Sequence, residues 1–144
     1  MRRRAAMKAW KIVKRIGTTA ATLAALDSVW LGVIMSDYYK EHLGELARRN
    51  DAGLTPDWTA VILVYVALTA GLNIFAVDTG SGGGRIRKSL IRGALFGLIS
   101  YGIYDLTNMA TLKGWSWEMT VADMLWGTFL CSVASAATAA AAAK

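Results

Sequence analysis

Residues 101–112 lie inside a long apolar run and have the sequence Tyr101-Gly102-Ile103-Tyr104-Asp105-Leu106-Thr107-Asn108-Met109-Ala110-Thr111-Leu112. They place a carboxylate, a carboxamide and two phenols in a segment that is otherwise hydrophobic. If this run crosses a bilayer, Asp105 and Asn108 stand in or near hydrocarbon, where an ionisable group is costly and needs a partner or water. Two other apolar runs carry an aspartate in the same situation. The sequence therefore indicates a membrane protein that holds polar groups among its helices.

Four apolar runs account for most of the 144 residues, and the apolar content of 55% exceeds the average of soluble proteins. Each run approaches or exceeds the roughly 20 residues that a helix needs to cross about 30 Å of hydrocarbon. We therefore predict an all-α polytopic membrane protein that forms a single domain over residues 1–144. Its four transmembrane helices are expected in a bundle, with spans at roughly 16–36, 57–78, 89–112 and 117–139.

Basic residues are distributed unevenly between these runs. Twelve of the 16 lysines and arginines lie before the first run, between the second and third runs, or at the end of the chain. Because cytoplasmic loops carry the excess of Lys and Arg, this placement predicts that both termini are cytoplasmic. It also accounts for the net charge of +6, so we expect membrane lipids as partners and no nucleic acid.

Three aspartates lie within the apolar runs, and the rise of a helix places all three in the middle-to-outer layer of the membrane. A four-helix bundle would gather them around one cavity that opens to the external face. The candidate ligand-binding residues are these aspartates and the polar or aromatic residues at helical spacing from them: Asp27, Trp30, Tyr101, Asp105, Asn108, Asp123 and Trp126.

Each candidate has an expected role. Asp105 is the central polar group, and Asn108 and Tyr101 orient it, because these residues share one side of their helix. Asp27 and Asp123 share or relay its proton. The sequence shows no nucleophile–base pair, so it leaves open whether the protein is an enzyme.

The segment Asp123-x-x-Trp126-Gly127 resembles Asp27-x-x-Trp30-x-Gly32 in the first run. We interpret both as an aspartate followed, one turn later, by a tryptophan that walls the cavity.

Three interpretations of the aspartates stay open at this point. They can act as interhelical hydrogen-bonding groups, as a site for a small molecule, lipid headgroup or proton, or as oxygen ligands of a hard cation together with Asn108. No His or Cys constellation supports haem, zinc or an iron–sulfur cluster, so we predict no such metal site and leave the cofactor unknown.

Other segments make local predictions. Gly93 and Gly97 form a small-xxx-small pair that permits close helix packing, and in a structural subunit this pair would be an exposed contact. Asn73 is expected to bond to another helix. Thr55-Pro56-Asp57 predicts a helix start with Thr55 as the N-cap.

The external connection between residues 37 and 57 has apolar residues at helical spacing. Tyr39, Leu43 and Leu46 recur with charged residues elsewhere on the helical wheel. This pattern predicts a short interfacial amphipathic helix.

Three stretches together resemble the predicted bacterial membrane proteins of domain-of-unknown-function family 2177. They are Asp27-Ser28-Val29-Trp30-Leu31-Gly32, Tyr104-Asp105-Leu106-Thr107-Asn108-Met109-Ala110-Thr111-Leu112 and Asp123-Met124-Leu125-Trp126-Gly127-Thr128. The resemblance covers nearly the whole chain and implies a four-span protein of the bacterial inner membrane. It also implies an association with lipid modification and stress responses. The arginine-rich start and the alanine run before Lys144 match no motif of this family.

We therefore expect an integral membrane protein that binds a lipid or small amphiphile in an Asp-lined cavity open to the outer side. Two alternatives belong to other classes: a proton- or cation-coupled carrier that uses the same aspartates, and a structural subunit of a membrane complex or homo-oligomer. A carrier predicts polar lining from both faces. Glycines buried within the bundle count against the structural subunit.

Overall fold

The computed structural model describes residues 2–43, 48–50, 53–80 and 83–142. Its elements are α1 (Arg2–Val29), α2 (Ser36–His42), β1 (Arg49–Asn50), β2 (Gly53–Leu54), α3 (Trp58–Gly71), α4 (Arg85–Thr111) and α5 (Trp117–Ala141). Two π-helical segments, η1 (Trp30–Ile34) and η3 (Leu72–Ala76), continue α1 and α3. The expected helical fold is confirmed, and within the described residues the exception is the short antiparallel pair of β1 with β2.

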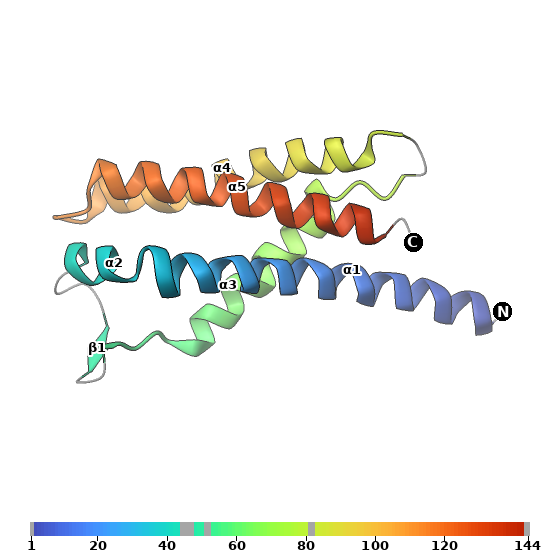
Figure 1. The fold of residues 1–144 in the computed structure, drawn as a ribbon, viewed down its shortest axis with the longest axis horizontal. Coiled ribbons are helices and arrows are strands. Elements are labelled where there is room, and N and C mark those ends of the chain that lie inside the picture. Colours follow the sequence, from blue (N-terminus) through green and yellow to red (C-terminus); the bar gives the residue numbers. More distant parts are fainter. Residues whose placement is uncertain (1, 44–47, 51–52, 81–82, 143–144) are drawn as a thin grey trace.

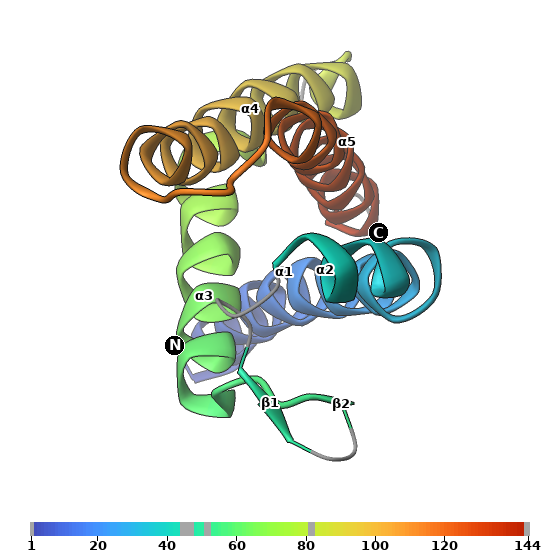
Figure 2. The same ribbon diagram turned by 90° about the vertical axis from the view of Figure 1, so that its left-hand side faces the viewer.

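The long helices run back and forth along one axis (Figure 1). α4 and α5 lie antiparallel and side by side, and α1 lies along them with its N-terminus at the same end as the C-terminus of the chain. α3 is strongly inclined to the others and crosses from the side of α1 to the side of α4 (Figure 2). The α4–α5 connection, α2 and the β1–β2 pair lie at the opposite end from the termini.

Three helical stretches in the described part are long and apolar enough to cross a membrane: Arg2–Ile34, Trp58–Ala76 and Trp117–Ala141. α4 is not among them, and its apolar stretch is interrupted by Arg92, Asp105 and Asn108. Its 27 residues cover about 40 Å at the usual helical rise, so length does not limit it. The structure thus supports a helical membrane protein with several spans.

The seam between α4 and α5 depends on glycine. A Cβ added at Gly97 would lie 2.0 Å from the carbonyl oxygen of Gly127, and one at Gly93 would lie 2.4 Å from that of Cys131. A larger residue at either position would force the helices apart. Small residues permit this close approach of backbones, as they do in other membrane proteins. Gly93 and Gly97 are buried against α5, and this position counts against their use as an exposed contact of a complex.

Two local predictions need correction. The N-cap of α3 is Asp57 and not Thr55, because the Asp57 carboxylate accepts hydrogen bonds from the backbone N–H groups of Thr59 and Ala60 at 2.9 and 3.2 Å. The charged side chain also suits the positive end of the helix. The expected interfacial helix is represented by the seven residues of α2, while Leu46 lies outside the described residues.

The apolar core lies where α1, η3 and α5 meet, around Leu23, Leu72, Ala76 and Leu130. Large apolar side chains cover much of the outer surface, including Leu63 on α3. An exposed apolar surface of this kind suits contact with lipid. The buried polar residues lie on either side of this core, along the length of the helices.

Candidate functional site

Asp27 connects three helices. Its side chain on α1 is 6% exposed and accepts a hydrogen bond at 3.0 Å from the hydroxyl of Tyr65 on α3. It also accepts one at 2.8 Å from the indole N–H of Trp126 on α5. Both carboxyl oxygens of Asp27 therefore have a neutral donor, the arrangement expected of a polar group that holds helices together in a membrane.

The two tryptophans do not wall a cavity, as the sequence pattern suggested. The rings of Trp30 and Trp126 stack on each other, with centroids 4.4 Å apart and an interplanar angle of 4°, and they fill the space between η1 and α5. The reason is the antiparallel course of the two helices, which brings the tryptophan of one Asp-x-x-Trp segment level with the aspartate of the other. Offset aromatic stacking of this kind is favourable beyond the area it buries.

The bonds between the two segments are not reciprocal. Trp126 donates to Asp27, but Trp30 makes no bond to Asp123. Asp123 is 8% exposed and instead accepts a hydrogen bond from the hydroxyl of Tyr39 on α2. Burial and the neighbouring carboxylate raise the pKa of Tyr39, so its hydroxyl remains a donor at physiological pH. The short helix α2 is thus attached to the buried carboxyl group of Asp123.

Asp105 is the polar group that stands apart. It is 0% exposed, and neither of its carboxyl oxygens has a hydrogen-bond partner among the described residues. Asp105 lies on α4, and Asp123 lies on α5, the helix packed against it.

The residues expected to orient Asp105 do not hydrogen-bond to it. Tyr101 lies flat against Gly127, where an added Cβ would be 2.2 Å from the phenol ring. Asn108 likewise makes no bond to the carboxyl group, since both oxygens of Asp105 are unpaired. A glycine in α5 therefore determines where Tyr101 lies, and this neighbour across the seam could not be identified from α4 alone.

Three close contacts define the register between α4 and α5: Gly93 with Cys131, Gly97 with Gly127, and Gly102 with Met124. Continuing this antiparallel register brings Asp105 level with Thr120. Thr120 is 1% exposed, and its hydroxyl also has no hydrogen-bond partner among the described residues. Two unsatisfied buried polar groups therefore lie at one level of the seam, and Thr120 was not among the candidates taken from the sequence.

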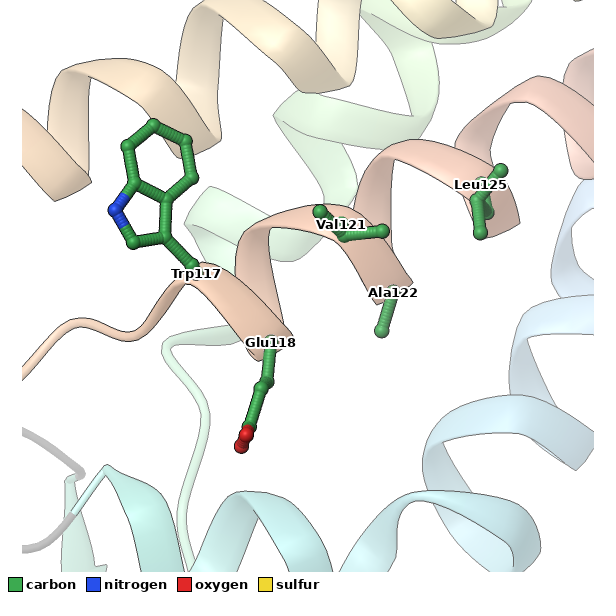
Figure 3. A pocket seen from close by; sticks show the side chains of 5 residues that line it. All are labelled: Trp117, Glu118, Val121, Ala122 and Leu125. Atoms are coloured by element: carbon green, nitrogen blue, oxygen red, sulfur yellow. The ribbon is translucent and has the colours of Figure 1, made fainter.

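A pocket of about 540 Å³ lies along the N-terminal part of α5, lined by Trp117, Glu118, Val121, Ala122 and Leu125 (Figure 3). None of the three aspartates lines it. Val121 and Leu125 are each two residues from Asp123, about 200° around the helix, so they occupy the opposite face. This pocket is therefore separate from the carboxyl groups.

A second polar cluster lies in the half of the molecule that contains the termini. Asn73 is its one member for which the sequence predicted a bond to another helix. Asn73 donates to the hydroxyl of Thr19 at 2.9 Å and accepts from the guanidinium of Arg15 at 3.2 Å. Thr19 is in turn 2.9 Å from Thr138 on α5. The prediction that Asn73 bonds to another helix is confirmed. The contact of Arg15 with Asn73 could have been predicted from their positions. Arg15 lies at the start of the first apolar run, and Asn73 lies level with it near the end of the second.

Within the described residues there is no group of three or more His, Cys, Asp or Glu side chains that could hold a metal ion. Asp27 and Asp123 accept hydrogen bonds from side chains of neighbouring helices, and Asp105 can accept hydrogen bonds from a further donor.

These features define the class: a helical membrane protein with several spans and carboxyl groups buried between its helices. The chain belongs to the family described as Predicted membrane protein (DUF2177), whose model matches residues 12–140. The matched range contains all three aspartates, and it confirms the resemblance carried by the three quoted stretches. No curated protein and no solved structure matches the chain.

Proposed function

We propose that the protein spans the bacterial inner membrane four times, with both termini cytoplasmic, and binds a lipid or small amphiphile at an outer site whose ligand-binding group is Asp105. The basic residues at the end of the molecule that holds the termini support this orientation. The 27-residue length of α4 and its close packing on α5 support a fourth span. The family resemblance adds a link to lipid modification or stress responses.

The observation that carries the binding role is the unsatisfied carboxyl group of Asp105. A buried polar group without a partner is destabilising, and it persists where a ligand, a proton or water completes it. Asp27 and Asp123 each have a protein donor, whereas both oxygens of Asp105 are free to accept one. Asp105 is therefore the group to which a ligand headgroup binds.

Access to Asp105 involves α2. This helix lies at the outer end of the bundle, and Tyr39 attaches it to Asp123. Because Asp105 is fully buried, a ligand enters when α2 moves and the Tyr39–Asp123 bond opens. The seven residues of α2 make this a small movement compared with separation of the long helices.

The test is native mass spectrometry of the purified protein, with identification of co-purifying lipids, for the wild type, Asp105→Asn and the matched control Asp27→Asn. Asparagine keeps the shape of the side chain and removes its charge. We expect a defined lipid or small molecule on the wild type and on Asp27→Asn, and its loss from Asp105→Asn. Binding of one unselective lipid mixture by all three proteins would contradict the proposal.

A second candidate is a proton- or cation-coupled carrier, and the Arg15–Asn73–Thr19–Thr138 cluster favours it. This cluster supplies polar groups in the half of the bundle opposite the outer aspartates, as a carrier requires. We expect a carrier reconstituted in vesicles to dissipate a pH or cation gradient, and Asp105→Asn and Asn73→Leu each to abolish the flux. A flux that persists in both variants would exclude this candidate.

A further inference from the structure

We propose that the outer site takes a primary ammonium group, as carried by a long-chain amine or by an aminophospholipid headgroup. This inference rests on the proposed function and specifies its ligand class. It depends on two properties of the seam between α4 and α5, the sign of the charge and the number of hydrogen-bond acceptors.

The charged residue types that are buried in the described part of the chain are all aspartates. Asp27, Asp105 and Asp123 are buried in the middle and outer parts of the bundle, and none of them forms a salt bridge within the described residues. An ion pair within the described residues joins Lys88 to Asp78 at 4.0 Å, at the N-terminal end of α4. An anionic headgroup at Asp105 would face the carboxyl groups of both Asp105 and Asp123, which disfavours it, whereas a cation is attracted.

The acceptors at the site match an ammonium. Within the described parts of the chain, both oxygens of Asp105 are unpaired, and so is the hydroxyl of Thr120, which lies level with Asp105 across the seam. An ammonium has three N–H donors, a hydroxyl has one and a quaternary ammonium has none. A primary amine can therefore satisfy all three oxygens, while a choline-type headgroup supplies the charge without the donors.

The experiment measures binding of four matched C12 probes to the purified protein by native mass spectrometry: dodecylamine, dodecyltrimethylammonium, dodecanol and dodecanoate. We expect saturable binding of dodecylamine to the wild type, at least about tenfold tighter than the other three, because hydrogen bonds between charged partners are the strong ones. Asp105→Asn is expected to remove this preference, and Thr120→Val to reduce it. Asp27→Asn, whose site is already filled by protein donors, should retain it.

The source of the ammonium is tested in nanodiscs that contain phosphatidylethanolamine or phosphatidylcholine. Retention of phosphatidylethanolamine by the wild type and not by Asp105→Asn indicates a lipid headgroup. A preference for dodecylamine without lipid selectivity indicates a free amine.

The outcomes separate this inference from the proposed function. If Asp105→Asn loses a co-purifying lipid that is neutral or anionic, the binding function stands and the ammonium inference is wrong. If the wild type binds dodecanol as tightly as dodecylamine and all variants behave alike, both are wrong. A thermal unfolding scan of each variant ensures that loss of binding is read only from folded protein.

Discussion

Asp27 and Asp105 are the same residue type in similar surroundings, and the structure treats them in opposite ways. Both are buried in apolar helices, yet Asp27 receives donors from two neighbouring helices while Asp105 receives none among the described residues. The difference lies in what faces them. Asp27 faces Tyr65 and Trp126, whereas the polar residue level with Asp105 across the seam is Thr120, whose hydroxyl makes no hydrogen bond to it.

The comparison teaches that burial alone does not assign a role to a carboxyl group between helices. A paired carboxyl group holds helices together, and its loss leaves donors unsatisfied. An unpaired one costs stability and is available for a ligand or a proton. The two aspartates can therefore be distinguished by stability and by binding, and the following predictions do so in order of decreasing effect.

The largest effect is expected for Asp27→Leu. Leucine has a similar volume but accepts no hydrogen bond, so the Tyr65 hydroxyl and the Trp126 N–H both lose their acceptor. We expect destabilisation of about 2–3 kcal/mol, from two unsatisfied buried donors. Thermal unfolding in detergent micelles, followed by tryptophan fluorescence, measures it. Unchanged stability would mean that these two bonds do not hold the helices together.

The matched substitution Asp105→Leu is expected to act in the other direction. No donor loses a partner, and an unsatisfied buried carboxyl group is removed, so stability should stay equal or rise by about 1–2 kcal/mol. The same unfolding measurement applies, alongside loss of ligand binding. A strong destabilisation would show that Asp105 has a structural partner and would remove the contrast with Asp27.

The sequence was sufficient for the helices and for the three aspartates that are buried between them, but not for the partners of these aspartates. The lengths of the apolar runs predicted the helices because hydrophobicity and helical rise are local properties. The two Asp-x-x-Trp segments marked the residues that join α1 to α5. Their pairing depends on the antiparallel register, which a single helix does not encode, so a cavity wall was expected where the indoles stack on each other.

The partners of Asp123 and Asp105 were harder to predict for the same reason. Tyr39 reaches Asp123 across 84 residues of sequence, through a connection whose course no local pattern specifies. Thr120 lies level with Asp105 because of the register between α4 and α5. Gly97 and Gly127 determine this register together.

A smaller effect separates the two stacked tryptophans. Trp126→Phe and Trp30→Phe both keep an aromatic ring in the stack, but only the first removes a donor to Asp27. We therefore expect Trp126→Phe to be less stable than Trp30→Phe by about 1 kcal/mol, the usual contribution of one hydrogen bond. A double-mutant cycle with Asp27→Leu checks the assignment. Equal losses, or no coupling of Trp126 to Asp27, would show that stacking alone accounts for the effect.

The smallest effect on stability is expected for Tyr39→Phe, since one hydrogen bond between membrane helices contributes about 0.6 kcal/mol on average. Its effect on the mobility of α2 should be larger, because this bond attaches α2 to Asp123. The raised pKa of Tyr39 means that the folded state favours the protonated hydroxyl, so its contribution is present below pH 10.0, the ordinary value for tyrosine, and is lost as the pH rises above it. We expect faster hydrogen–deuterium exchange in residues 36–42 of the Tyr39→Phe variant at neutral pH, with Tyr38→Phe as the matched control. Since Tyr38 makes no bond to Asp123, equal exchange in the two variants would show that Tyr39 does not hold α2 over Asp105.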